Sequence, residues 1–221
     1  MSESLFQRVR SDIQQGVYKC IDPAVRGLVR IGATPNMMTT VGLVGNLAAA
    51  ALIILAAYAD KVSEGYALLG WAGVLTILFS IFDMVDGYMA RTADMVTRFG
   101  AFYDSVLDRY CELCTLSALA FYFMLMERRL FALITFLALI GSIMVSYVRA
   151  RAEAMGCECK VGLMQRPERV VVTSVGLLLT GLLQDVVAFD PVWLIAVPIM
   201  LIAVLANATA VARILHVRRR L

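Results

Sequence analysis

The chain has 221 residues, of which 61% are hydrophobic, and its formal net charge is +3. A soluble domain is usually about 45–50% apolar. The excess here lies in runs of roughly 20 residues, the length that crosses a bilayer as a helix. This pattern excludes an ordinary soluble domain, and we expect no nucleic-acid partner.

The first segment, residues 1–22, predicts an amphipathic helix at the membrane surface. Its apolar residues recur at spacings of three and four, and basic residues lie among its polar positions. Such a helix binds the interface and places its basic residues near anionic headgroups. A short solvated helix is the alternative. The apolar positions are Leu5, Val9, Ile13, Val17 and Cys20.

Residues 23–221 form the second predicted domain, which contains six long apolar runs. They are too long and too uniform for the alternating strands of a membrane barrel. Asn36 is the predicted N-cap of the first run. The expected fold is therefore an all-α membrane protein with six transmembrane helices and an N-terminal interfacial helix. The runs cover about 37–59, 68–92, 100–125, 130–152, 168–184 and 191–215.

Basic residues are distributed unequally between the two sides that six crossings would define. Sixteen of the 20 Lys and Arg residues fall on the side of the N-terminus, and Arg109 lies inside the third run. Only Lys61, Arg128 and Arg129 fall on the other side. Cytoplasmic loops carry the excess of basic residues. Both termini are therefore predicted to be cytoplasmic.

Two pairs of carboxylates lie where the second run ends and the third begins. Asp83 and Asp86 are three residues apart, and Asp104 and Asp108 are four apart, so each pair shares one helix face. Four neighbouring carboxylates could not all ionise without a cation. Oxygen ligands without Cys or His favour Mg²⁺, Mn²⁺ or Ca²⁺ over zinc. The cluster also lies on the predicted cytoplasmic side.

Two other interpretations of the acidic cluster stay open at this point. The acids could form intramembrane ion pairs with Arg91, Arg98 and Arg109. They could also line an ion or proton pathway, because ionisable residues inside membranes usually serve function. The small residues Gly87 and Gly100 favour a third interpretation, since they leave space for a diphosphate with a planar base.

The spacing D-x₂-D-G-x₂-A-R-x₈-G-x₃-D-x₃-D resembles the signature of the CDP-alcohol phosphotransferase family at every fixed position. It runs from Asp83 to Asp108. The resemblance implies a metal-dependent enzyme in which an alcohol attacks a CDP-linked lipid and CMP leaves. It also implies six crossings and a homodimer.

The family resemblance assigns roles to residues within the signature. Asp83, Asp86, Asp104 and Asp108 would ligate Mg²⁺ or Mn²⁺, with two ions expected, and Asp108 would be the general base. The CDP-binding residues would be Gly87, Ala90, Arg91, Thr97 and Gly100.

Two further segments indicate the acceptor. "SYVRARAEAMG" and "RPERVVV" resemble segments of the family's bacterial phosphatidylinositol-phosphate synthases, with Arg149 in place of a lysine. Arg166 and Arg169 are three residues apart on one helix face, and with Arg149 or Arg151 they could bind a phosphate dianion. Arg149 and Arg151, two residues apart, cannot both face one point.

The resulting hypothesis is an enzyme of the bacterial plasma membrane that joins CDP-diacylglycerol to inositol 1-phosphate. The products would be phosphatidylinositol phosphate and CMP, and membrane lipids would surround the enzyme. Phosphatidylglycerophosphate synthesis from glycerol 3-phosphate is the alternative within the family. An ion or proton transporter is the alternative of another class.

Overall fold

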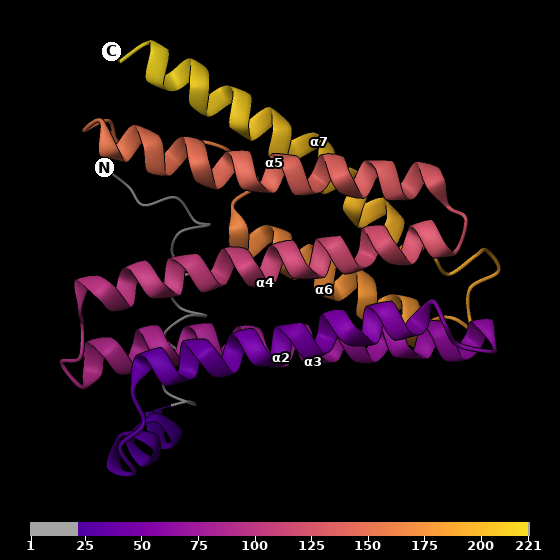
Figure 1. Ribbon diagram of the computed structural model, residues 1–221, viewed down its shortest axis with the longest axis horizontal. Helices are drawn as coiled ribbons and strands as arrows, with labels where there is room; N and C mark the ends of the chain where they lie inside the picture. The colour runs from indigo at the N-terminus through magenta and orange to yellow at the C-terminus, as the bar shows by residue number, and fades with distance from the viewer. Residues whose placement is uncertain (1–21, 221) are drawn as a thin grey trace. The chain divides into compact units, whose positions relative to one another are not determined.

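The computed structural model describes residues 22–220, and all regular structure in that range is helical. A short helix covers residues 22–30. Six long helices follow in the described part of the chain (Figure 1). The predicted interfacial helix, residues 1–22, lies almost entirely outside the described residues. The long helices are α2 (Pro35–Ala56), α3 (Val62–Thr92), α4 (Arg98–Leu125), α5 (Arg129–Ala154), α6 (Arg166–Leu182) and α7 (Trp193–Arg218).

Helix α2 begins one residue earlier than Asn36, so the predicted N-cap is wrong. The Met37 backbone N–H donates to the Thr34 hydroxyl oxygen at 3.4 Å, which makes Thr34 the cap. Pro35 then occupies the first helical position, where its fixed φ and missing N–H cost nothing. Asn36 lies in the first turn, where it lines a cavity.

Within residues 22–220, four helices are long and apolar enough to cross a membrane: α2, α3, α5 and α7. The protein is therefore an integral membrane protein. Helix α4 begins with several charged residues between Arg98 and Glu112, and α6 has only 17 residues. The expectation of six crossings is thus supported for four helices.

Contacts between Cα atoms divide the chain into two compact units. The first contains the described part of Met1–Gly42 together with Phe79–Leu107, and the second contains Leu43–Leu78 and Asp108–Leu221. Each unit has its own apolar core, one around Met38 and Met89 and the other around Leu119 and Ile195. In the second unit, α7 packs against both α5 and α6 (Figure 1).

Candidate functional site

A cavity of about 220 Å³ in the first unit is lined in part by the C-terminal portion of α3, which includes Asp86. All five predicted CDP-binding residues line it, and so do Asp86 and Asp104. Helices α2, α3 and α4 and the segment between α3 and α4 all contribute. The lining residues are Pro35, Asn36, Thr39, Asp86, Gly87, Ala90, Arg91, Met95, Val96, Thr97, Gly100, Ala101 and Asp104. We call this the aspartate pocket.

The start of α4 shapes one wall of the aspartate pocket. The Gly100 N–H donates to the Thr97 hydroxyl oxygen at 2.9 Å, so Thr97 is the N-cap of α4. A Cβ on Gly100 would lie 2.9 Å from that hydroxyl oxygen and 3.3 Å from the Asn36 side-chain oxygen. A side chain at this position would therefore displace the cap and enter the pocket.

Asp86 is the most enclosed carboxylate of the aspartate pocket, with 4% of its surface exposed. It accepts a hydrogen bond from the Thr39 hydroxyl at 2.8 Å. It also lies near enough to Asp104 and Asp83 for electrostatic repulsion. Within residues 22–220 it has no ion-pair partner. A buried carboxylate with two like-charged neighbours fits a hard divalent cation.

The carboxylates are not gathered into a complete set of metal ligands. No three His, Cys, Asp or Glu side chains in residues 22–220 are arranged to hold a metal ion. Asp83 is absent from the lining of the aspartate pocket, and a Cβ on Gly42 would lie 3.3 Å from its Oδ1.

A second cavity, of about 310 Å³, lies in the second unit and is rich in arginine. Asp108, which is 9% exposed, lies in its wall. Arg166 approaches Asp108 Oδ1 at 2.7 Å, and Arg109 approaches Oδ2 at 3.8 Å. Its lining is Asp108, Arg109, Val145, Ser146, Arg149, Gln165, Arg166, Pro167 and Arg213. We call this the arginine pocket.

Two of the four predicted acceptor-phosphate arginines do not line the arginine pocket. Arg169 is 1% exposed, and its Nε and Nη2 both donate to the carboxylate of Glu112. Its Nη1 donates to the Met164 carbonyl oxygen at 3.0 Å. Arg151 is exposed, because two residues of helix turn it away from Arg149. The structure thus brings Arg149 and Arg166 together and leaves the other two elsewhere.

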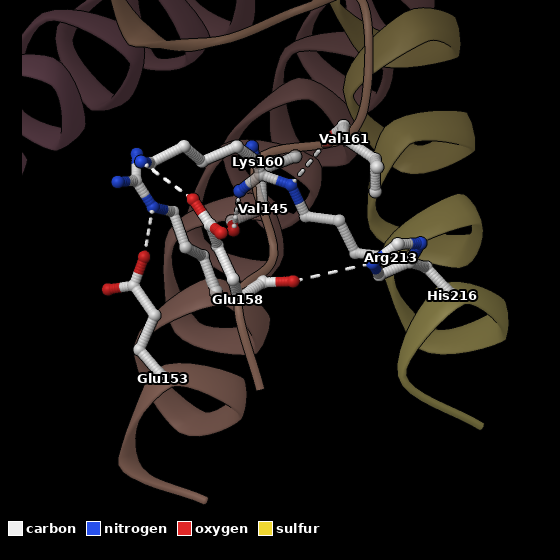
Figure 2. Close-up of polar contacts among 8 residues, drawn as sticks. Val145, Glu153, Glu158, Lys160, Val161, Arg213 and His216 are labelled. Atoms are coloured by element: carbon white, nitrogen blue, oxygen red, sulfur yellow. Dashed lines mark hydrogen bonds and ion pairs between the residues drawn. The ribbon is translucent and has the colours of Figure 1, made fainter. Parts of the chain in front are cut away.

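Arg213 lines the arginine pocket and was missed by sequence reasoning; Figure 2 shows its contacts with Val145 and Val161. It is 2% exposed and projects from α7. Its Nη1 donates to the Val145 carbonyl oxygen at 2.6 Å, and its Nε donates to that of Val161 at 2.9 Å. These two bonds hold a cation at the wall of the arginine pocket. In the sequence, Arg213 is a single arginine inside an apolar run, and it is one of the sixteen basic residues predicted to lie on the cytoplasmic side.

A third cavity, in the first unit, includes none of the predicted site residues. Arg26 and Arg30 from the helix over residues 22–30 line it, as does Tyr88. The Tyr88 hydroxyl donates to Asp22 at 2.9 Å and lowers the pKa of that carboxyl, with a smaller contribution from Arg26. These contacts join the short helix to α3.

The CDP-alcohol phosphatidyltransferase family model matches residues 32–209 of the chain. Among its curated relatives is the phosphatidylinositol phosphate synthase of Cutibacterium acnes, which is 35% identical over 92% of this chain and 95% of its own length. The enzyme of the same name from Corynebacterium glutamicum is 35% identical over 73% of this chain and 70% of its own length.

Solved structures resemble the fold as well. The phosphatidylinositol phosphate synthase of Mycobacterium tuberculosis with CDP-DAG bound has a TM-score of 0.76 at 30% identity, covering 88% of this chain and 92% of that one. The same enzyme in complex with manganese and citrate has a TM-score of 0.77 at 30% identity, covering 89% and 88%.

Proposed function

Because the chain belongs to the CDP-alcohol phosphatidyltransferase family, we propose that it transfers the phosphatidyl group of CDP-diacylglycerol to inositol 1-phosphate. The products are phosphatidylinositol phosphate and CMP. The arginine pocket is the observation that supports inositol 1-phosphate as the acceptor. It provides an anion site lined by Arg149, Arg166 and Arg213, in addition to the aspartate pocket. The names of the relatives support the same reaction.

The aspartate pocket is the proposed site for the CDP group. Gly87, Ala90 and Gly100 leave room for the nucleotide, Arg91 pairs with a phosphate and Thr97 fixes the wall. The relative solved with CDP-DAG supports this role.

Asp83, Asp86, Asp104 and Asp108 are the proposed ligands for two Mg²⁺ or Mn²⁺ ions. When bound, the ions neutralise diphosphate charge and stabilise the departing CMP. The manganese complex of a relative supports a divalent metal.

The arginine pocket is the proposed site for the acceptor. Arg149 and Arg166 bind the phosphate of inositol 1-phosphate through charge-assisted hydrogen bonds. Asp108 accepts the proton of the attacking hydroxyl. The new bond forms between that oxygen and the phosphorus on the lipid side, and the bond to CMP breaks. Free inositol lacks the anion that these arginines bind.

The proposed topology has six crossings, with both termini and both pockets on the cytoplasmic side of a bacterial plasma membrane. The charges of α4 end at Glu112, and residues 113–125 carry none. In α6, residues 170–182 are likewise uncharged. Each of these uncharged portions is shorter than the roughly 20 residues that a crossing needs, so the family resemblance carries the proposal that α4 and α6 also cross. A homodimer is proposed from family resemblance.

CMP release by the purified protein tests the proposed function. The assay contains CDP-diacylglycerol and Mg²⁺, and compares inositol 1-phosphate, free inositol, glycerol 3-phosphate and serine. We expect turnover with inositol 1-phosphate, its loss in EDTA and its return on addition of Mn²⁺. Turnover with glycerol 3-phosphate alone would make the protein a phosphatidylglycerophosphate synthase. Ion flux in sealed vesicles without CMP release would indicate a transporter.

A further inference from the structure

Thr39, in the first turns of α2, lines the aspartate pocket and is nearly enclosed, with 4% of its surface exposed. Its hydroxyl lies 2.8 Å from Asp86 Oδ2 and 3.0 Å from the Pro35 carbonyl oxygen. Asp86 is also 4% exposed. The contact is therefore between two buried side chains 47 residues apart in sequence.

A hydroxyl has one hydrogen, so Thr39 can donate fully to only one of these acceptors. Threonines within helices commonly donate to the carbonyl four residues earlier, as Thr115 and Thr135 do here. Thr39 differs because a carboxylate oxygen is the nearer acceptor. Hydrogen bonds to an ionised acceptor are roughly twice as strong as neutral ones, so the Asp86 carboxylate is the preferred acceptor when it is ionised.

This hydrogen bond opposes the force that would turn Asp86 away. Asp104 and Asp83 both repel the Asp86 carboxylate, and an unrestrained side chain would rotate to increase its distance from them. The Thr39 hydroxyl fixes one carboxylate oxygen in the pocket wall. The rotamer is then set before a cation arrives, which lowers the entropy lost on binding.

We infer that Thr39 is a positioning residue for a divalent-cation site, because its buried hydroxyl orients the Asp86 carboxylate. The inference rests on the proposed metal role of Asp86. It adds a residue of α2, outside the aspartate signature, to the determinants of metal affinity. Partners that orient a metal ligand typically contribute about 10- to 100-fold in affinity.

The chain offers a matched set of variants for this test. Thr39→Val keeps the shape and removes the hydroxyl, whereas Thr39→Ser keeps the hydroxyl and removes the methyl group. Thr40→Val is the control, because Thr40 is exposed and its hydroxyl contacts Asn36 and Tyr103 instead. Thermal unfolding in EDTA checks that each of the three variants still folds cooperatively, so that its Mn²⁺ affinity is measured on folded protein.

Mn²⁺ binding to the full-length protein, followed by electron paramagnetic resonance, is the primary measurement. We expect Thr39→Val to weaken Mn²⁺ binding about tenfold, with Thr39→Ser and Thr40→Val within about twofold of wild type. Saturating Mn²⁺ should restore kcat in Thr39→Val. An unchanged affinity in Thr39→Val, or an equal loss in Thr39→Ser, would overturn the inference. No Mn²⁺ binding by the wild-type protein would instead refute the proposed metal site.

Discussion

The arginines at the ends of α5 and α6 resemble one another in sequence and differ in what they contact. Arg149 and Arg166 line the arginine pocket, and Arg166 contacts Asp108. Arg169 is fully engaged by Glu112 and Met164, and Arg151 is exposed. Only the first two line the arginine pocket, where Arg149 pairs with Glu153 and Arg166 pairs with Asp108. At the scale of single residues, the position of each side chain therefore decides which arginines can serve the proposed acceptor site.

Arg149 and Arg151 form a matched pair for testing the acceptor site. We expect Arg149→Gln to raise KM for inositol 1-phosphate at least tenfold, because it removes a cation from the arginine pocket. Arg151→Gln should leave KM within about twofold. Steady-state CMP release at varied inositol 1-phosphate measures both. Equal effects of the two changes would show that general positive charge, rather than the pocket, determines acceptor binding.

Asp108 is the carboxylate for which we predict a loss in the chemical step. Asp108→Asn should lower kcat about 10²- to 10⁴-fold, the usual contribution of a general base, while CDP-diacylglycerol still binds. Single-turnover CMP release and equilibrium binding of the nucleotide lipid separate the two effects. Near-wild-type turnover in Asp108→Asn would remove Asp108 from the proton transfer.

At the scale of elements, α6 is held in the second unit by close backbone contact and by one buried ion pair. A Cβ on Gly73 of α3 would lie 2.8 Å from the Ser174 carbonyl oxygen. A Cβ on Gly70 would lie 2.8 Å from the Gly181 Cα. Glycine allows this approach because it has no side chain. Small residues on facing helices also permit the packing on which association in lipid depends.

The Glu112–Arg169 pair predicts a stability effect that is distinct from catalysis. Removing one partner of a buried ion pair costs about 3–5 kcal/mol, or a fall of about 10 °C in unfolding midpoint for a chain of this length. We expect this for Glu112→Leu and for Arg169→Met alone. The double variant should recover most of the loss, since two apolar residues leave no unpaired charge.

The exposed Arg149–Glu153 pair provides the control for this experiment. Its side chains are 39% and 45% exposed. Glu153→Ala should therefore change stability by less than about 0.5 kcal/mol. Unfolding in detergent, followed by circular dichroism, compares all four variants. Equal midpoints for Glu112→Leu and Glu153→Ala would contradict the structural role of the buried pair.

At the scale of the whole molecule, membrane topology remains a prediction that fusion proteins can test. Six crossings place Glu127 outside and Glu158 in the cytoplasm. If only the four most apolar helices crossed, the two positions would be reversed. Alkaline phosphatase, which is active outside, and green fluorescent protein, which fluoresces inside, are fused after each position. We expect phosphatase activity at Glu127 and fluorescence at Glu158.

Helix existence and the family of this protein could be predicted from sequence because both depend on local pattern. The six apolar runs match α2 to α7 within a few residues, apart from an earlier start of α3. Hydrophobic length is a property of consecutive residues. The spacing from Asp83 to Asp108 likewise identified the family, which the comparison of residues 32–209 confirms.

The tertiary structure decided which residues meet, since those contacts join helices distant in sequence. Thr39 and Asp86 are 47 residues apart, and Glu112 and Arg169 are 57 apart. No local sequence pattern predicts that Arg169 pairs with Glu112 on α4. Nor does one predict that Arg213 donates to the Val145 carbonyl oxygen. A spacing along one helix gives the face of a residue, but packing against another helix determines what that face contacts.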